Sequence, residues 1–385
     1  MKIQIDGTGT VNKGAELMLY AILQEIERKY PDAEVLYNSI GEKRSYIQTS
    51  LNFKIRPFVE KVLPVLNRIK IPGILYRLSI PCSLVTNKYP VKGLDVVLDA
   101  GGFQFSDQWK RSDFDLLLWE RYYRKLKEQG TKIILLPQAF GPFETIYGKK
   151  MAKMISTYAD IIFAREKISY KYLINTGVDK NKTKSYPDFT ALVEGIFPKQ
   201  YESLKGGVCI IPNKRMIDKG IISQKDYLSI ICLMIGIIRN NGKTPFLLNH
   251  EGQQDTRLCE AINTQLKIPL AIVDQLTALE VKGVISQSYL VISSRFHGVA
   301  SALNSGVPCL ATSWSHKYEE LFKDYHQSDC ILDLIHPETM LKKVENFLSE
   351  KTHNDVSEKL KAIKPIILEK NEKMWNVVWD FCSLK

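Results

Sequence analysis

The sequence predicts an α/β protein made of two doubly wound Rossmann-like domains with a cleft between them. Short apolar segments alternate with segments of helical spacing along the whole 385-residue chain. This alternation is typical of βαβ units and a parallel sheet. A polar, lysine-rich stretch at 194–207 interrupts the alternation, which then resumes. The length also favours more than one domain, because a single core commonly serves about 150 residues.

The first predicted domain covers residues 1–195. Its opening segment, 3–6, is short and apolar like a buried strand, whereas 14–30 carries apolar residues at helical spacing, among them Leu17 and Ile22. The same reasoning gives further strands at 34–37, 94–99, 132–137 and 160–165, and further helices at 114–129, 149–158 and 167–176.

The second predicted domain covers residues 205–360, and a C-terminal helix at 361–385 is expected to cross back to the first domain. The long helical pattern at 357–379 supports that crossing. A short helix at 301–308 is expected to stop at Gly306 and Pro308. The remaining pattern gives strands at 207–212, 244–249, 270–273, 289–292, 307–312 and 330–334, and helices at 225–240, 255–266, 278–287 and 340–350.

The composition is that of a soluble globular protein, with 45% hydrophobic and 25% charged residues. No apolar run reaches the roughly 18 residues that span a bilayer, and the N-terminus lacks the apolar core of a signal peptide. We therefore expect a cytoplasmic location. The six His and seven Cys form no CxxC or HExxH pattern, so no bound metal is expected.

The net charge of +11 is unevenly distributed. Residues 54–92 form a basic, apolar excursion in which eight cations accompany one acid, Glu60. Such a segment either contacts anionic lipid or packs as a solvated excursion on its own domain, and the sequence leaves both open. No known nucleic-acid-binding motif accompanies the charge, so nucleic acid is not an expected partner.

The most informative segment is 293–300, which follows an apolar strand and contains Arg295, Phe296, His297 and Gly298. It places a fixed cation and a titratable imidazole at the carboxyl end of a strand. In open parallel sheets ligands bind at that edge. An arginine beside a helix N-terminus also suits an anion, and a histidine can exchange a proton near neutral pH.

Other predicted strands also end in polar or glycine-rich segments. The loop 7–16 precedes the first helix, 99–105 contains Asp99, Gly101, Gly102 and Gln104, and Arg165 ends another strand. In the second domain, strands are followed by 212–215 and 249–255. Each has a structural alternative, namely a plain turn, a loop cap or surface charge. Their common place at strand ends favours one ligand site at the cleft.

Taken in order, these segments resemble the polysaccharide pyruvyl transferases over nearly the whole chain. The block 294–298 and the Gln-x-x-Gly-Pro turn at 138–142 are the most specific parts. The matching segments are Asn12-Lys13-Gly14-Ala15-Glu16, Asp99-Ala100-Gly101-Gly102, Pro137-Gln138-Ala139-Phe140-Gly141-Pro142, Ala164-Arg165-Glu166, Ser294-Arg295-Phe296-His297-Gly298, Gly306-Val307-Pro308 and Lys317-Tyr318.

The resemblance implies a glycosyltransferase-B-like fold and transfer of the enolpyruvyl group of phosphoenolpyruvate to a glycan acceptor. Phosphoenolpyruvate is then a substrate, and neither cofactor nor metal is implied. Arg165 and Arg295 would bind its two anionic groups, and His297 would supply a proton. Asp99 would orient or deprotonate an acceptor hydroxyl. The further substrate-binding residues are expected to be Phe296, Gly298, Asn12, Gly14, Gly101, Gly102, Gln104, Lys214, Asn249 and Lys317.

The sequence departs from the family pattern in the loop 12–16. Members often have an acid directly after the glycine of Asn-x-Gly, whereas here Ala15 follows Gly14 and the acid is Glu16. Two other functions use the same residue pattern. One is a nucleotide-sugar glycosyltransferase, and the other is a sugar-binding module without activity. The sequence does not define the acceptor sugar, its lipid linkage, the ketal stereochemistry or the oligomeric state.

Overall fold

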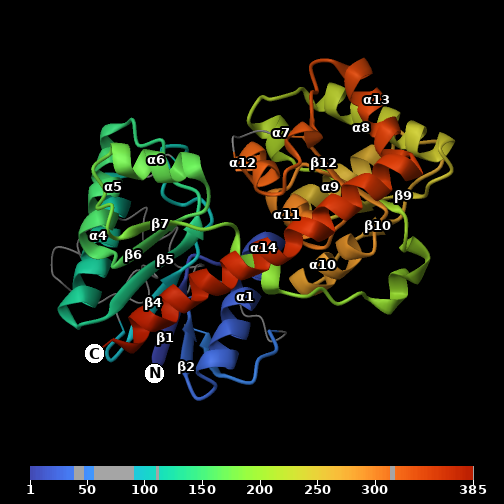
Figure 1. Cartoon of the computed structure of the whole chain (residues 1–385). Helices are drawn as coiled ribbons and strands as arrows, with labels where there is room; N and C mark the ends of the chain where they lie inside the picture. Colours follow the sequence, from blue (N-terminus) through green and yellow to red (C-terminus); the bar gives the residue numbers. More distant parts are fainter. Residues whose placement is uncertain (39–46, 56–90, 110–111, 313–316, 385) are drawn as a thin grey trace. The chain divides into compact units, whose positions relative to one another are not determined.

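The computed structural model describes residues 1–38, 47–55, 91–109, 112–312 and 317–384 (Figure 1). Most of the basic excursion predicted at 54–92 therefore lies outside the described residues. The chain forms two compact units. Unit 1 comprises Met1–Thr10, Met18–Phe189 and Glu372–Lys385, and unit 2 comprises Val11–Leu17 and Thr190–Asn371.

Unit 1 contains a parallel sheet with the strand order β3-β2-β1-β4-β5-β6-β7 (Figure 1). The register places Ile3 of the central strand β1 beside Val35 on one side and Val96 on the other. The described strands are β1 Lys2–Asp6, β2 Glu34–Tyr37, β3 Asn52–Ile55, β4 Val96–Asp99, β5 Lys132–Gln138, β6 Ile161–Ala164 and β7 Thr183–Ser185.

The helices of unit 1 contribute apolar faces to its core. Trp119 of α4 and Met151 of α5 are buried in one cluster with Val97 and Ile133 of the sheet. Thr145 caps α5 by accepting a hydrogen bond from the Gly148 amide at 2.9 Å, which explains why this helix begins before the predicted residue 149. The described helices are α1 Lys13–Lys29, α4 Asp113–Glu128, α5 Ile146–Tyr158 and α6 Lys167–Asn175.

Unit 2 contains a second parallel sheet with the strand order β10-β9-β8-β11-β12-β13 (Figure 1). Its described strands are β8 Val208–Ile211, β9 Pro245–Leu248, β10 Ile272–Val273, β11 Leu290–Ser293, β12 Cys309–Thr312 and β13 Ile331–Leu332. Both sheets thus contain the doubly wound order 3-2-1-4-5-6, to which unit 1 adds a seventh strand, β7, and the prediction of two Rossmann-like α/β domains is confirmed.

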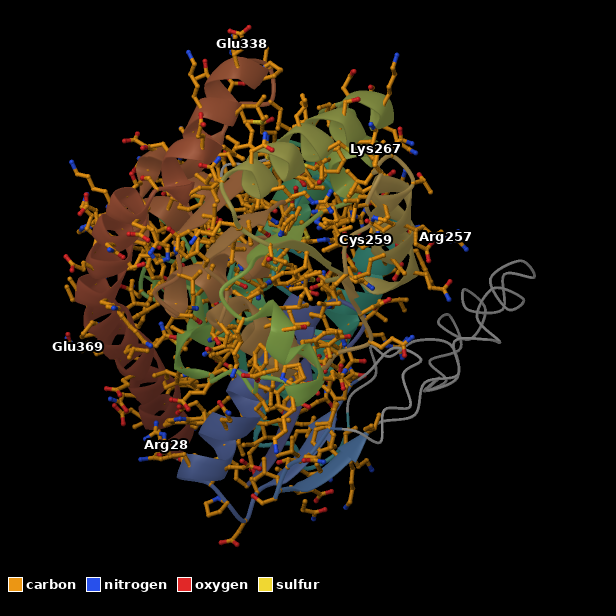
Figure 2. The ribbon with its side chains drawn as sticks, turned by 90° about the vertical axis from the view of Figure 1, so that its right-hand side faces the viewer. Arg28, Arg257, Cys259, Lys267, Glu338 and Glu369 are labelled. Atoms are coloured by element: carbon orange, nitrogen blue, oxygen red, sulfur yellow. The ribbon has the colours of Figure 1, made fainter. Side chains whose placement is uncertain are left out.

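Helix α9 of unit 2 has one buried and one exposed face. In α9, Cys259 is fully buried with Leu258, whereas Arg257 points outward from the same helix (Figure 2). The described helices are α7 Arg215–Asp218, α8 Gln224–Asn240, α9 Gly252–Asn263, α10 Ala278–Ser286, α11 Phe296–Asn304, α12 Lys317–Asp324, α13 Pro337–Leu348 and α14 Glu350–Ser383; the 3-10 helices are η2 Phe189–Leu192, η3 Lys199–Leu204 and η4 Ser328–Cys330. None of the described helices is long and apolar enough to cross a membrane.

Helix α14 contributes to the cores of both units. Leu360 is fully buried in the core of unit 2. Trp375 and Trp379 are buried in unit 1 and stack with ring centroids 5.4 Å apart, and Trp375 also meets Phe189 edge-on. Burial of such large side chains explains why the last turns of this 34-residue helix are ordered.

The strand orders reverse between β1 and β4 in unit 1, and between β8 and β11 in unit 2. At these positions the register pairs Asp6 with Asp99, and Ile211 with Ser293. Ligands of doubly wound sheets bind at the carboxyl ends of the strands where the order reverses. The segments 7–16, 99–105, 212–215 and 293–300 follow these four strands and therefore lie where each sheet favours a ligand, whereas Arg165 and 249–255 follow β6 and β9.

Candidate active site

Helix α11 begins five residues earlier than the sequence pattern predicted. Arg295 is its N-cap, and the amide of Val299 donates to the Arg295 carbonyl oxygen at 3.0 Å. The Ser293 hydroxyl accepts the Arg295 amide at 3.0 Å, which turns the chain directly from β11 into the helix. The expected start at 301 was therefore wrong, because this local hydrogen bond is not visible in the apolar periodicity. His297 and Gly298 lie in the first turn of α11.

The guanidinium group of Arg295 is buried and lies between two carboxylates. Its Nη1 donates to Glu251, and its Nη2 donates to Asp255. Only 7% of the arginine is exposed, and Asp255 is fully buried. Arg295 is therefore held in one position by α9, and its terminal nitrogens already carry negative partners in the structure.

His297 lies against the segment that precedes α1. A Cβ atom added to Gly14 would be 2.1 Å from His297 Nδ1, so only glycine fits at this position. The amide of Lys13 donates to the His250 carbonyl oxygen at 3.1 Å, and Asn12 forms an isolated β-bridge with Glu251. These contacts place the predicted residue Gly14 beside His297 and the predicted residue Asn12 beside Glu251.

The segment 12–16 is itself held by side chains. Asn12 Oδ1 accepts the amides of Gly14 at 2.9 Å and Ala15 at 3.2 Å, which caps α1. The carboxylate of Glu16 is fully buried and pairs with Lys13 at 2.7 Å. The acid that is displaced by one place from the family pattern thus supports the loop through Lys13.

A buried network supports the turn between β11 and α11. The Ser294 hydroxyl bonds to Tyr227 at 2.9 Å, and the Ser294 carbonyl oxygen accepts from Asn213 and Tyr318, both at 2.8 Å. Burial raises the pKa of Tyr227 to about 12, so its hydroxyl stays protonated and available as a donor. The network fixes the position from which Arg295 and His297 project.

The other predicted residues of unit 2 lie around this turn, but they differ in their surroundings. The backbone of Lys214 donates to Asp255 at 3.3 Å. Lys317 Nζ lies 5.6 Å from the ring centroid of Phe296, which itself is 7% exposed. Gly298 has no room for a side chain, because an added Cβ would lie 2.6 Å from the Ser293 hydroxyl.

Asn249 fits a structural role better than a binding role. Its Nδ2 donates to Asp274 Oδ1 at 2.7 Å and to Thr256 at 2.8 Å. Its Oδ1 accepts the amide of Glu251 at 3.1 Å. Both ends of the amide side chain are therefore used to connect β9, α9 and β10.

The neighbouring residue His250 lies in the predicted strand-end segment 249–255, but it was not among the predicted site residues. Its side chain is 3% exposed, and burial lowers its pKa well below the usual range, with further lowering by the positive charge of Arg295. Nδ1 of this imidazole has no hydrogen-bond partner among the described residues. Glu251 and Asp255 belong to the same predicted segment and were likewise not named as site residues. Their partner is 40 or more residues away, and only the position of His250-Glu251 after a strand signalled them.

Unit 1 buries Asp99 at the end of β4. The carboxylate is fully buried, accepts the Gly101 amide at 3.1 Å and the side-chain amide of Gln104, and receives the hydroxyl of Tyr123 at 3.3 Å. Burial, followed by the charge of Asp99, raises the pKa of Tyr123 well above its usual value. This arrangement favours a loop-holding role for Asp99 over direct contact with an acceptor.

Two glycines let the loops after β1 and β4 approach each other. A Cβ atom on Gly7, whose φ is +78°, would lie 2.6 Å from the amide nitrogen of Gly101. A Cβ atom on Gly101 would collide with Gln104 at 2.1 Å. Gly102 has φ +65°, a left-handed conformation that favours glycine. The four predicted residues Asp99, Gly101, Gly102 and Gln104 therefore form one tight loop.

Arg165 ends β6 and is 5% exposed. Its Nη1 lies 3.5 Å from Asp188 Oδ2, and its Nε lies 3.8 Å from Glu166 Oε2. Like Arg295, it is a buried arginine beside two carboxylates. Arg165 and Asp99 belong to unit 1, whereas Arg295 and His297 belong to unit 2. No group of His, Cys, Asp and Glu among the described residues is arranged to hold a metal ion.

A family model decides the relationship of the chain. The model of the polysaccharide pyruvyl transferase family matches residues 12–316, which include every predicted site residue except Lys317. The chain belongs to the polysaccharide pyruvyl transferase family. It is therefore a transferase of polysaccharide biosynthesis. No curated protein sequence matches it significantly.

Solved structures of other enzymes share the fold. UDP-GlcNAc 2-epimerase from Methanocaldococcus jannaschii matches with 14% identity and a TM-score of 0.54, covering 91% of this chain and 94% of the epimerase. Staphylococcus aureus MnaA with UDP matches with 11% identity and a TM-score of 0.59, covering 93% of this chain and 91% of MnaA. Anabaena Alr3699/HepE with UDP-glucose matches with 11% identity and a TM-score of 0.59, covering 99% of this chain and 100% of HepE. The glycosyltransferase-B-like fold is thus confirmed.

Proposed function

We propose that the chain transfers the enolpyruvyl group of phosphoenolpyruvate to two hydroxyls of a sugar in a surface or capsular polysaccharide precursor. The products are a pyruvate ketal and free phosphate. The observation that carries the proposal is the family match over 12–316, together with Arg295 and His297 at the first turn of α11. A single turn then supplies a cation, backbone amides and a titratable group for an anionic donor.

The proposed chemistry assigns a step to each group of that turn. His297 gives a proton to the methylene carbon of the donor, and a sugar hydroxyl adds to the neighbouring carbon. The second hydroxyl then attacks the same carbon, and the C–O bond to phosphate breaks. The amides at the start of α11 stabilise the departing phosphate, because the helix N-terminus carries partial positive charge. Of the two hydroxyl protons, one restores the proton that His297 gave up, and the other goes to the departing phosphate, which leaves as hydrogen phosphate.

Two arginines are proposed to bind the donor. Each must then share its guanidinium group between the donor and the carboxylates that already lie beside it. Arg295 and Arg165 each lie beside two carboxylates, so neither presents a free fork to an anion in the described conformation. Arginine can hold more than one acceptor through its five N–H groups. The donor carboxylate and phosphate are proposed to compete with these carboxylates for the guanidinium nitrogens of the two side chains.

For the acceptor, we propose a lipid-linked glycan used at the cytoplasmic face of the inner membrane leaflet. The support is the sequence of the basic excursion at 54–92, whose charge and apolar residues suit an anionic lipid surface. Asp99 is assigned a supporting part on the acceptor side, through the loop of Gly101 and Gln104.

The decisive experiment is release of inorganic phosphate from phosphoenolpyruvate in the presence of candidate lipid-linked glycans. We expect release that depends on the glycan and that falls by about 100-fold or more in H297A, as for loss of a general acid. Phosphoenolpyruvate binding, measured by calorimetry, should remain in this variant.

Two outcomes would contradict the proposal. Absence of phosphate release with every acceptor, combined with turnover of a nucleotide sugar, would identify a glycosyltransferase instead. Glycan binding that H297A leaves unchanged, with no turnover of any donor, would indicate a sugar-binding module.

A further inference from the structure

The two carboxylates that hold Arg295 are not equivalent. Both come from the start of α9, but the side chain of Asp255 has no exposed surface, whereas that of Glu251 is 28% exposed. Each takes a different terminal nitrogen, with Glu251 on Nη1 and Asp255 on Nη2. Only the Glu251 carboxylate can therefore turn toward water without the penalty of moving a buried charge.

Asp255 is fixed by further contacts. Its Oδ1 accepts the amide of Lys214 at 3.3 Å, while its Oδ2 binds Arg295. It lies on the buried face of α9 together with Leu258 and Ile262. An incoming ligand cannot displace such a carboxylate without disrupting the core of unit 2.

Glu251 is attached mainly through its backbone. Its amide donates to Asn249 Oδ1 at 3.1 Å, and it forms the isolated bridge with Asn12. It occupies the N-cap position of α9, yet its side chain makes no capping hydrogen bond. Rotation of this side chain would leave the backbone contacts in place.

The local charge balance favours such a rotation when an anion arrives. One guanidinium and two carboxylates leave an excess negative charge in a buried setting, where like charges repel strongly. Once Glu251 has turned away, Arg295 and Asp255 form a neutral pair. Nη1, which Glu251 occupies in the structure, then becomes available to the arriving anion.

We propose that Glu251 acts as an internal anion that occupies Nη1 of Arg295 in the empty site and yields it to a phosphate or carboxylate group of the ligand, while Asp255 keeps the guanidinium in place. The inference rests on the proposed function only in taking Arg295 as an anion-binding residue. The affinity of the site for an anion is then set by the difference between two binding free energies, that of Arg295 with the ligand and that of Arg295 with the Glu251 carboxylate.

The test measures binding of two probes, inorganic phosphate and phosphoenolpyruvate, by isothermal calorimetry with the full chain. We expect E251Q to bind both about tenfold more tightly, because a neutral amide competes less well for the guanidinium. E251D should act in the same direction, since its carboxylate is one methylene shorter. E260Q is the matched control, because Glu260 is an exposed residue of the same helix, and it should bind like the wild type.

The outcomes separate this inference from the proposed function. Equal or weaker binding of both probes by E251Q and E251D, in folded protein, would overturn the role of Glu251. D255N should weaken binding, because Arg295 loses its fixed partner; tighter binding by D255N would overturn the assignment of the two carboxylates. None of these results depends on pyruvyl transfer, whose failure would appear as absent phosphate release alone.

Discussion

The imidazole of His297 fills the space that a side chain at position 14 would need. In G14A the added methyl group would meet Nδ1 at 2.1 Å, so the ring or the loop must move. Displacement of a reacting group by about 1 Å can cost about 100-fold in rate. We therefore expect G14A to lose most of its turnover in the phosphate-release assay while its melting temperature changes little.

Gly9 offers a matched control in the same loop. An added Cβ at this position has no neighbour within 4 Å, and its φ is not in the left-handed region. G9A should therefore retain turnover close to that of the wild type. Wild-type turnover in G14A would refute the placement of His297 against this loop.

His250 predicts how stability depends on pH. Burial, and then the positive charges near it, lower its pKa well below the ordinary value of 6.5, so the folded chain keeps the imidazole neutral. The unfolded chain binds a proton below about pH 6.5. Because the unfolded state then holds more protons, the stabilisation is complete above about pH 6.5 and is lost as the pH falls below it.

The variant H250Q removes this titration. Urea unfolding at pH 7.5 and pH 5.5 should show that the wild type loses about 1 kcal/mol more than H250Q between these two conditions, since one pKa unit corresponds to about 1.4 kcal/mol. Equal losses in the two proteins would mean that His250 is already charged, or accessible to water, in the folded chain.

At the scale of elements, the sequence predicted the central strands of both sheets and the edge strands β10 and β13 of unit 2, but not the edge strands of unit 1. Strands such as β2 and β5 are continuous apolar runs because both faces of a parallel sheet are covered. The edge strands β3 and β7 were missed. Their sequences, NFKI and TKS, include exposed polar residues, so periodicity does not identify them.

In the candidate site too, some residues could be predicted from the sequence and others could not. Arg295, His297, Asp99 and Arg165 could be selected because each follows an apolar strand, and strand ends are where doubly wound sheets bind ligands. Their hydrogen-bond partners could not be selected in this way. The contacts of Arg295 with Glu251 and Asp255 join residues 44 and 40 positions apart, which no local pattern encodes. The early start of α11 likewise depends on one hydroxyl, that of Ser293.

For the whole molecule, the units do not follow the chain order from which the domains were predicted. Residues 11–17 group with unit 2 although the residues on both sides belong to unit 1, and the last 14 residues, from Glu372, return to unit 1. The segment 11–17 has several tertiary contacts with unit 2, including the bridge of Asn12 with Glu251 and the packing of Gly14 against His297, and no local pattern encodes them.

The net charge of +11 predicts that the whole protein binds to anionic membrane surfaces. We expect the chain to co-float with anionic liposomes at low salt and to be released by salt, because screening weakens surface charge interactions. Substituting glutamine for Lys61, Arg68, Lys70 and Arg77 of the basic excursion should reduce binding by about two to three orders of magnitude, at about 1 kcal/mol per cation.

A control variant with the same net charge as this quadruple variant distinguishes lipid contact by the basic excursion from general attraction of a basic protein to anionic lipid. Glutamine in place of Lys351, Lys359, Lys361 and Lys370, which are exposed on α14, removes four charges elsewhere. If the excursion contacts lipid, this control should float nearly as well as the wild type. Equal losses in the two variants would leave only nonspecific attraction of a basic protein, and absence of flotation at low salt would contradict the membrane contact altogether.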